Sequence, residues 1–363
     1  MRANPESSAH DALCTKHDVA HYSGCMVGTG VGDAFGAPIE FMKLKKIVRE
    51  YGPGGLTDLV VDKKRGTISF TDDTQQAMFT ADGLIKSSLR KGSIWSGPDL
   101  ETMFASYRDW YKVCALAESA DTGWLSELPG LYGTRGGGKT SHAVLSGDVM
   151  GSLANPLNDS AGSGGVMRSA PIGLMYYASP ERAFDIAVEC AALTHGNPGG
   201  YLPAGLYAAV IAYIIQGKGV AEAADAALAH LRKRADGAGM EKMLVDAIAL
   251  AANDGIDARE AIKFIGRGWR GDEALSIALY CAIRHPCDYL SCIIEATNHD
   301  GDSDTVGSIA GGIVGTYLGL DGIPISFVNR LPMAAELVTL AEDVFNAPAD
   351  IADAGRRYPQ RKM

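Results

Sequence analysis

Two short stretches of the chain place carboxylates beside threonines. One reads FTDDTQ and the other NHDGDSDT, and both precede a run typical of a helix. Their oxygen-bearing residues are Thr71, Asp72, Asp73, Asp302, Asp304 and Thr305. Buried carboxylates repel one another unless protons or cations bridge them, and hard oxygen ligands suit Mg²⁺ or Mn²⁺. Two such clusters in one chain therefore predict a site for a pair of divalent cations.

Each cluster taken alone has a simpler explanation. Thr71 followed by two aspartates is a normal helix start, with an N-cap and acids at the positive end of the helix dipole. The second stretch opens like an EF-hand loop, but Thr305 and Gly311 occupy the positions of the required Gly and Glu. The presence of both clusters is what favours metal binding.

A third stretch, GTGVGDAFGAPIEF at residues 28–41, is predicted to be the end of a helix. No strand precedes it, so its glycines do not indicate a dinucleotide site. The spacing of Gly28, Gly32 and Gly36 would let another element approach closely. Glu40 follows the helix-stopping Pro38, and we expect it either beside the core or in solvent.

Two further stretches are rich in glycine. GTRGGGKTS, residues 133–141, has the spelling of a phosphate-binding P-loop, which would make the protein a nucleotide triphosphatase. A P-loop follows a buried strand, whereas the preceding WLSELPGLY is interrupted by Pro129 and Gly130, so this alternative is disfavoured. SAGSGGVMRSAPIGL, residues 160–174, predicts either a turn that offers N–H groups to an anion or a simple helix connection.

Composition limits the class of protein. The chain has 363 residues, of which 47% are hydrophobic and 21% charged, so it can bury a large core. A net charge of −10 argues against a nucleic-acid partner. Seven widely spaced cysteines predict neither disulfides nor a zinc site. The first residues lack a signal-peptide core and the longest apolar run, AGLYAAVIAYII, is short for a bilayer, so we expect a cytoplasmic protein without a membrane partner.

Apolar periodicity predicts an all-α protein with one compact domain over residues 22–350. Residues 1–21 form an N-terminal extension in this prediction and residues 351–363 a C-terminal tail, whose basic end RRYPQRKM we expect to be frayed. We expect helices to begin near Tyr22, Thr74, Leu100, Thr140, Pro180, Gly199, Val220, Met240, Asp257, Asp272, Pro286, Asp304 and Ala334.

The motifs, taken in order, resemble the ADP-ribosylglycohydrolase family, which includes the bacterial enzyme that reactivates dinitrogenase reductase. They are GTGVGDAFGAPIEF, the TDDTQ motif, GGVMR at residues 164–168, the pair Thr194 and His195, and GDSDT at residues 301–305. The resemblance covers residues 22–345. One departure is Asp300, which stands where the family usually has Gly.

The resemblance implies a compact all-α hydrolase with two Mg²⁺ or Mn²⁺ ions. It would cleave the glycosidic bond between ADP-ribose and a modified protein side chain, arginine being favoured. The implied metal ligands are Thr71, Asp72, Asp73, Asp302, Asp304 and Thr305. The implied contacts to ADP-ribose are His195, Ser163, Gly164, Gly165 and Val166 for the ribose and adenosine, and Gly133, Gly136, Gly137 and Gly138 for the diphosphate.

Three matters stay open at this stage. The general base could be Glu40, Asp73 or Asp304. The N-terminal extension could contact an ADP-ribosyltransferase toxin, since some family members act as immunity proteins. A module that binds ADP-ribose or a toxin without catalysis is the alternative to an enzyme.

Overall fold

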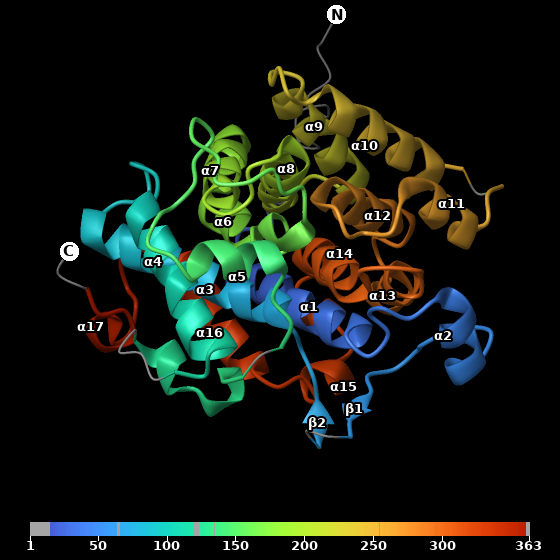
Figure 1. Cartoon of the computed structure of the whole chain (residues 1–363), viewed down its shortest axis with the longest axis horizontal. Helices are drawn as coiled ribbons and strands as arrows, with labels where there is room; N and C mark the ends of the chain where they lie inside the picture. The colour runs from blue at the N-terminus through green and yellow to red at the C-terminus, as the bar shows by residue number, and fades with distance from the viewer. Residues whose placement is uncertain (1–14, 64–65, 119–122, 134, 254, 361–363) are drawn as a thin grey trace, which may run out of the picture.

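Helices provide nearly all the regular structure in this computed structural model, which describes residues 15–63, 66–118, 123–133, 135–253 and 255–360 (Figure 1). Within those residues the strands are β1 (Val61–Asp62) and β2 (Thr67–Ile68), an antiparallel pair. The α-helices are α1 (Val19–Gly36), α2 (Leu44–Tyr51), α3 (Asp72–Lys91), α4 (Leu100–Trp110), α5 (Lys139–Leu145), α6 (Ala170–Met175), α7 (Pro180–Ala192), α8 (Pro198–Ile215), α9 (Val220–Leu231), α10 (Ala238–Ala251), α11 (Ala258–Ile265), α12 (Gly271–Arg284), α13 (Tyr289–Thr297), α14 (Ser303–Leu318), α15 (Ile325–Val328), α16 (Ala334–Asn346) and α17 (Ala354–Arg357). The shorter helical turns are η1 (Tyr111–Ala115), η2 (Trp124–Glu127), η3 (Pro129–Leu131), η4 (Ser163–Gly165) and η5 (Leu320–Gly322).

The all-α prediction is confirmed, and every predicted helix start lies within three residues of an observed one. The sequence missed the short helices α2, α6, α15 and α17. Helix α2 shows why, because the backbone N–H of Leu44 at its start donates to the side chain of Asp300, which is remote in sequence. The aspartate at position 300, which departs from the family pattern, therefore caps the start of α2.

Helices α1 and α14 lie against each other at the centre of the molecule with glycines at their contact (Figure 1). A methyl group built on Gly28 would lie 2.3 Å from the carbonyl oxygen of Gly311, and one on Gly32 only 1.9 Å from that of Gly307. Gly36 meets the backbone of Ser303 in the same way. The close approach predicted from the glycine spacing is confirmed, and it joins α1 to the start of α14.

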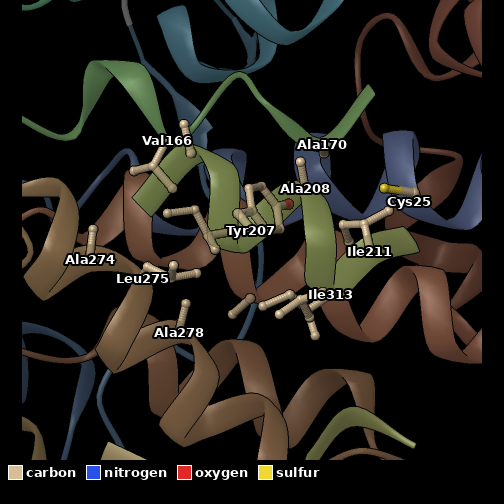
Figure 2. Close-up of a cluster of buried hydrophobic side chains, with 14 of the residues drawn as sticks. Cys25, Val166, Ala170, Tyr207, Ala208, Ile211, Ala274, Leu275, Ala278 and Ile313 are labelled. Carbon is tan, nitrogen blue, oxygen red and sulfur yellow. The ribbon is translucent and has the colours of Figure 1, made fainter. Parts of the chain in front are cut away.

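Helix α8 forms the second part of the core. By length and composition it could cross a membrane, but 89% of its apolar window is buried inside the structure, as in a core helix. Figure 2 shows Tyr207, Ala208 and Ile211 of this helix beside Leu275 of α12 and Ile313 of α14. Helix α8 thus packs against α12 and α14, the two helices that follow Trp269 and Asp302.

The two ends of the domain differ from the prediction. Helix α1 begins at Val19, and before it the N–H of Lys16 donates to the carbonyl of Ile215. Residues 1–14 of the predicted extension lie outside the described residues. The expectation of a frayed C-terminal tail is wrong up to residue 360, because Tyr358 is buried and its hydroxyl donates to Asp343.

The glycine contact gives a stability prediction. Replacing Gly32 by Ala forces a methyl group into the backbone of α14, which should cost about 3 kcal/mol of unfolding free energy. Gly239→Ala is the matched control, because no atom lies within 4 Å of the added methyl group on this helical glycine. Thermal and denaturant unfolding of the two variants would measure the difference, and equal stability would contradict the backbone contact.

Candidate active site

A cavity of about 470 Å³ opens where α3 and α14 begin, next to the segment that follows α1. Most of the predicted site residues meet here, although they come from six separate stretches of the chain. They are Glu40, Asp72, Asp73, Gly136, Gly137, Gly138, Ser163, Gly164, His195, Asp302, Asp304 and Thr305. The other lining residues, which the sequence did not single out, are Phe41, Lys139, Thr140, Gly162, Met167 and Trp269.

Four predicted site residues lie elsewhere. Thr71 lines a neighbouring cavity of about 410 Å³, and Gly133 lines neither cavity. Gly165 packs against α8, since a methyl group there would lie 2.6 Å from the carbonyl oxygen of Gly200. The side chain of Val166 is fully buried in the apolar core (Figure 2). The expected part of Val166 in holding the ribose and adenosine stays a prediction, and its side chain is not among those that line the cavity.

One group of acids lies at the start of α14. Ligand oxygens of Glu40, Asp302 and Asp304 all lie within 4.8 Å of one another. Asp302 accepts a hydrogen bond of 2.8 Å from the hydroxyl of Ser163, and Asp304 accepts one of 3.0 Å from the N–H of Thr305. These donors orient the two carboxyl groups, both of which line the cavity.

A second group of acids lies at the start of α3. Thr71 is the N-cap, as predicted, and accepts from the N–H of Asp73. Asp72 accepts hydrogen bonds of 2.6 Å from the N–H of Gly137 and 2.7 Å from the side chain of Gln76. The Oδ1 atom of Asp73 is buried without a hydrogen-bond partner among the described residues. A buried carboxylate oxygen left in this state is costly unless a cation or another ligand meets it.

Asp33 on α1 is a buried acid that the sequence prediction missed. It accepts hydrogen bonds from the backbone N–H and the hydroxyl of both Thr71 and Thr74. The carboxylate thereby ties the first turn of α3 to α1. The signal was present in the sequence, because an acid inside an apolar, glycine-rich helix must have buried partners.

Burial and mutual repulsion raise the pKa values of these carboxyl groups. Desolvation, with Asp304 close by, raises the pKa of Glu40 to about 9. Burial likewise raises the pKa of Asp302 to about 7 and that of Asp72 to about 6, and it places those of Asp73 and Asp304 well above their ordinary values. No ion pair joins any of these acids to a Lys or Arg in the described part of the chain. A set of hard oxygen donors without a protein cation fits divalent metal ions.

The glycine-rich loop forms another wall of the cavity. Gly136 and Gly137 have φ angles of +105° and +93°, and a methyl group on Gly136 would lie 2.7 Å from Asp72. The described residues before this loop form the turns η2 and η3, and they contain no strand. The triphosphatase alternative therefore lacks the strand that a P-loop requires.

Two aromatic rings stand at the mouth of the cavity. Phe41 and Trp269 stack with ring centroids 5.2 Å apart, yet 75% of Phe41 and 40% of Trp269 remain exposed. Phe41 also has a φ of +63°, which is uncommon for a bulky residue. Nothing in the sequence pairs these two rings, because Phe41 follows α1 and Trp269 precedes α12. They offer flat apolar surfaces beside Glu40.

Comparisons with known proteins agree with this geometry. A family model described as ADP-ribosylglycohydrolase matches residues 15–353. The ADP-ribosyl-[dinitrogen reductase] glycohydrolase of Rhodospirillum rubrum is 24% identical, over 86% of this chain and 90% of that protein. ADP-ribosylhydrolase ARH3 of Bos taurus is 25% identical, over 90% of this chain and 92% of that protein. ADP-ribosylarginine hydrolase Tri1 of Pseudomonas putida (strain GB-1) is 23% identical, over 89% of this chain and 77% of that protein.

A solved structure of an ADP-ribosylglycohydrolase-related protein complex contains a chain with the same fold. Its TM-score is 0.62 at 23% identity, and the match covers 90% of this chain and 97% of that chain.

The raised pKa values predict how stability depends on pH. Asp302 and Glu40 hold protons in the folded state up to about pH 7 and pH 9, whereas unfolded carboxyl groups lose them near pH 4. The folded state then binds more protons, so the unfolding free energy should fall as pH rises. For metal-free protein we expect a loss on the order of 1 to 2 kcal/mol between pH 7 and 8.5.

Denaturant unfolding in EDTA at several pH values would measure this loss. The double variant Glu40→Gln, Asp302→Asn should show a flatter dependence over the same range. A wild-type stability that rises between pH 7 and 8.5 would contradict the protonated cluster.

Proposed function

Because the chain belongs to the ADP-ribosylglycohydrolase family, we propose that it hydrolyses the glycosidic bond between ADP-ribose and a modified protein side chain with the help of divalent metal ions. The observation that carries the proposal is the meeting of two carboxylate groups, from α3 and α14, in one cavity that also contains Glu40. The names of three relatives, a glycohydrolase, a hydrolase and an arginine hydrolase, point to the same reaction.

The residues that would hold two Mg²⁺ or Mn²⁺ ions are Asp72 and Asp73 at the start of α3, Asp302 just before α14, and Asp304 and Thr305 in the first turn of α14. Bound ions of this kind activate water and polarise sugar hydroxyl groups. The unpartnered oxygen of Asp73 supports this assignment. The hydroxyl of Thr71 donates a hydrogen bond to Asp33, and in this way Thr71 helps to orient the start of α3.

Proton transfer in the cavity is best assigned to Glu40. Cleavage at the anomeric carbon needs a carboxyl group that gives a proton to the leaving group or takes one from water. Glu40 is the half-buried member of its cluster and lies at the mouth, whereas Asp73 and Asp304 are buried. Its position lets it reach both solvent and a bound leaving group.

Arginine is the linkage that we favour. A guanidinium is planar, always charged, and stacks on aromatic faces. Phe41 and Trp269 provide such faces at the mouth of the cavity, and Glu40 provides a nearby carboxyl group. One relative is named as an ADP-ribosylarginine hydrolase.

Two finer predictions remain proposals. Immunity against an ADP-ribosylating toxin would involve residues 1–21, of which 1–14 lie outside the described residues. A cytoplasmic location is likewise a proposal from the sequence.

The proposal is tested by release of ADP-ribose from an arginine-ADP-ribosylated protein. We expect release with Mg²⁺ or Mn²⁺, none with EDTA, and a fall in kcat of at least about 100-fold in Asp302→Ala. Asp148→Ala, at an exposed surface aspartate, is the control and should keep full activity. Binding of ADP-ribose without release under any metal would favour the non-catalytic module, and metal-dependent ATP hydrolysis would favour the triphosphatase.

A second experiment tests the assigned proton donor and the linkage. Glu40→Gln should lower kcat by about 10² to 10⁴-fold, as expected for loss of a general acid or base. Trp269→Ala should raise KM for the arginine-linked substrate more than for a serine-linked one. An equal effect of Trp269→Ala on both substrates would contradict recognition of the guanidinium by the aromatic pair.

A further inference from the structure

Arg168 is a fully buried charged side chain near the cavity, with 0% exposure. It follows η4, and its guanidinium lies 3.9 Å from the centre of the Tyr107 ring. Its hydrogen-bond partners among the described residues are neutral: the side chains of Gln76 and Thr194 and the carbonyl oxygen of Cys190. A buried arginine without a carboxylate partner is rare, so its contacts call for a specific explanation.

One set of contacts leads from Arg168 to the acids of α3. Its Nη1 donates to Oε1 of Gln76 over 2.8 Å, and Nε2 of Gln76 donates to Oδ2 of Asp72 over 2.7 Å. A guanidinium has donors but no acceptor, so the amide oxygen of Gln76 must face Arg168. The amide nitrogen must then face Asp72, and the carboxylate is held in one orientation.

The other set of contacts leads to the opposite wall of the cavity. Nη2 of Arg168 donates to the hydroxyl oxygen of Thr194 over 2.7 Å. That hydroxyl lies 2.8 Å from Nδ1 of His195, and its other acceptor, the carbonyl of Ala191, is farther away at 3.4 Å. Because Thr194 accepts from Arg168, its own proton can go to the nearer acceptor, Nδ1. With Nδ1 as the acceptor, the single ring proton of neutral histidine lies on Nε2.

His195 is suited to act as a neutral donor. It lines the cavity, and no described residue forms a hydrogen bond with its Nε2 atom. Burial, with Arg168 close by, lowers the pKa of His195 to about 3, so the ring is neutral at physiological pH. A methyl group built on Gly164 would lie only 3.1 Å from Nε2, so a side chain at this position would crowd the atom, and glycine leaves it uncovered.

We propose that Arg168 is a positioning residue that fixes two walls of the cavity at once: through Gln76 it orients Asp72, and through Thr194 it holds His195 in the tautomer whose Nε2–H donates to an oxygen atom of the bound ligand. The identification of that ligand as ADP-ribose rests on the proposed function. The tautomer itself does not, because it is a property of the protein without ligand.

The first experiment is therefore NMR of the ligand-free protein labelled with ¹⁵N-histidine. Long-range ¹H–¹⁵N correlations distinguish the two neutral tautomers, and His195→Gln identifies the signals of this residue. We expect His195 of the wild type to be in the Nε2–H form. An Nδ1–H form in the wild type would overturn the proposal.

Thr194 provides the matched pair of variants. Thr194→Val keeps the shape but removes the hydroxyl, so the tautomers should mix and the affinity for ADP-ribose, measured by calorimetry, should fall about five- to tenfold. Thr194→Ser keeps the hydroxyl and should resemble the wild type in both measurements. If Thr194→Val keeps a pure Nε2–H tautomer, Arg168 does not act through Thr194 and the proposal fails.

Arg168→Lys tests whether the guanidinium of Arg168 holds both Gln76 and Thr194. A lysine keeps the charge but cannot hold Gln76 and Thr194 in the fixed geometry of a planar guanidinium, so the His195 tautomers should mix in this variant also. A pure Nε2–H tautomer in a folded Arg168→Lys protein would overturn the role of Arg168. If that variant does not fold, the Thr194 pair still decides the proposal.

Discussion

The backbone contact between α1 and α14 is the constraint on which the site depends. Glycines on both helices let the two backbones touch, and the contact continues to Gly36 and Ser303, where α1 ends and α14 begins. Glu40 follows the end of α1, and Asp302 immediately precedes α14. A wider helix separation would move these carboxylates apart. The same contact that closes the core therefore sets the distances within the acid cluster.

The cluster itself opposes folding in the absence of cations. Burial raises the pKa of each acid in it, so the metal-free protein keeps protons on groups that would ionise in water. The surrounding core supplies the stability that makes this arrangement possible, which is common at functional sites. Asp33 and Arg168 lie outside the cavity and do not contact its lining acids directly. Asp33 accepts hydrogen bonds from Thr71 and Thr74 in the first turn of α3, and Arg168 donates to Gln76 and Thr194.

The sequence predicted those features that depend on local pattern. Paired acids at helix starts, glycines at helical spacing and the order of the motifs indicated the helices, the acid clusters and the family. It could not show what depends on contacts between distant segments. The pairing of Phe41 with Trp269, the capping of α2 by Asp300 and the burial of Val166 each depend on residues far apart in the chain. Asp33 lies within the GTGVGDAFGAPIEF motif, but only the hydrogen bonds that it accepts from Thr71 and Thr74 show that it ties α3 to α1.

The α1–α14 contact also has a consequence for how the chain is made. Gly32 and Gly307 touch although they lie 275 positions apart in the sequence. During synthesis, α1 leaves the ribosome long before α14 exists, and its apolar surface lacks its partner for most of translation. Closing so long a loop before the central contact forms makes folding slow. The nascent N-terminal half thus exposes the apolar surface of α1 until α14 has been made.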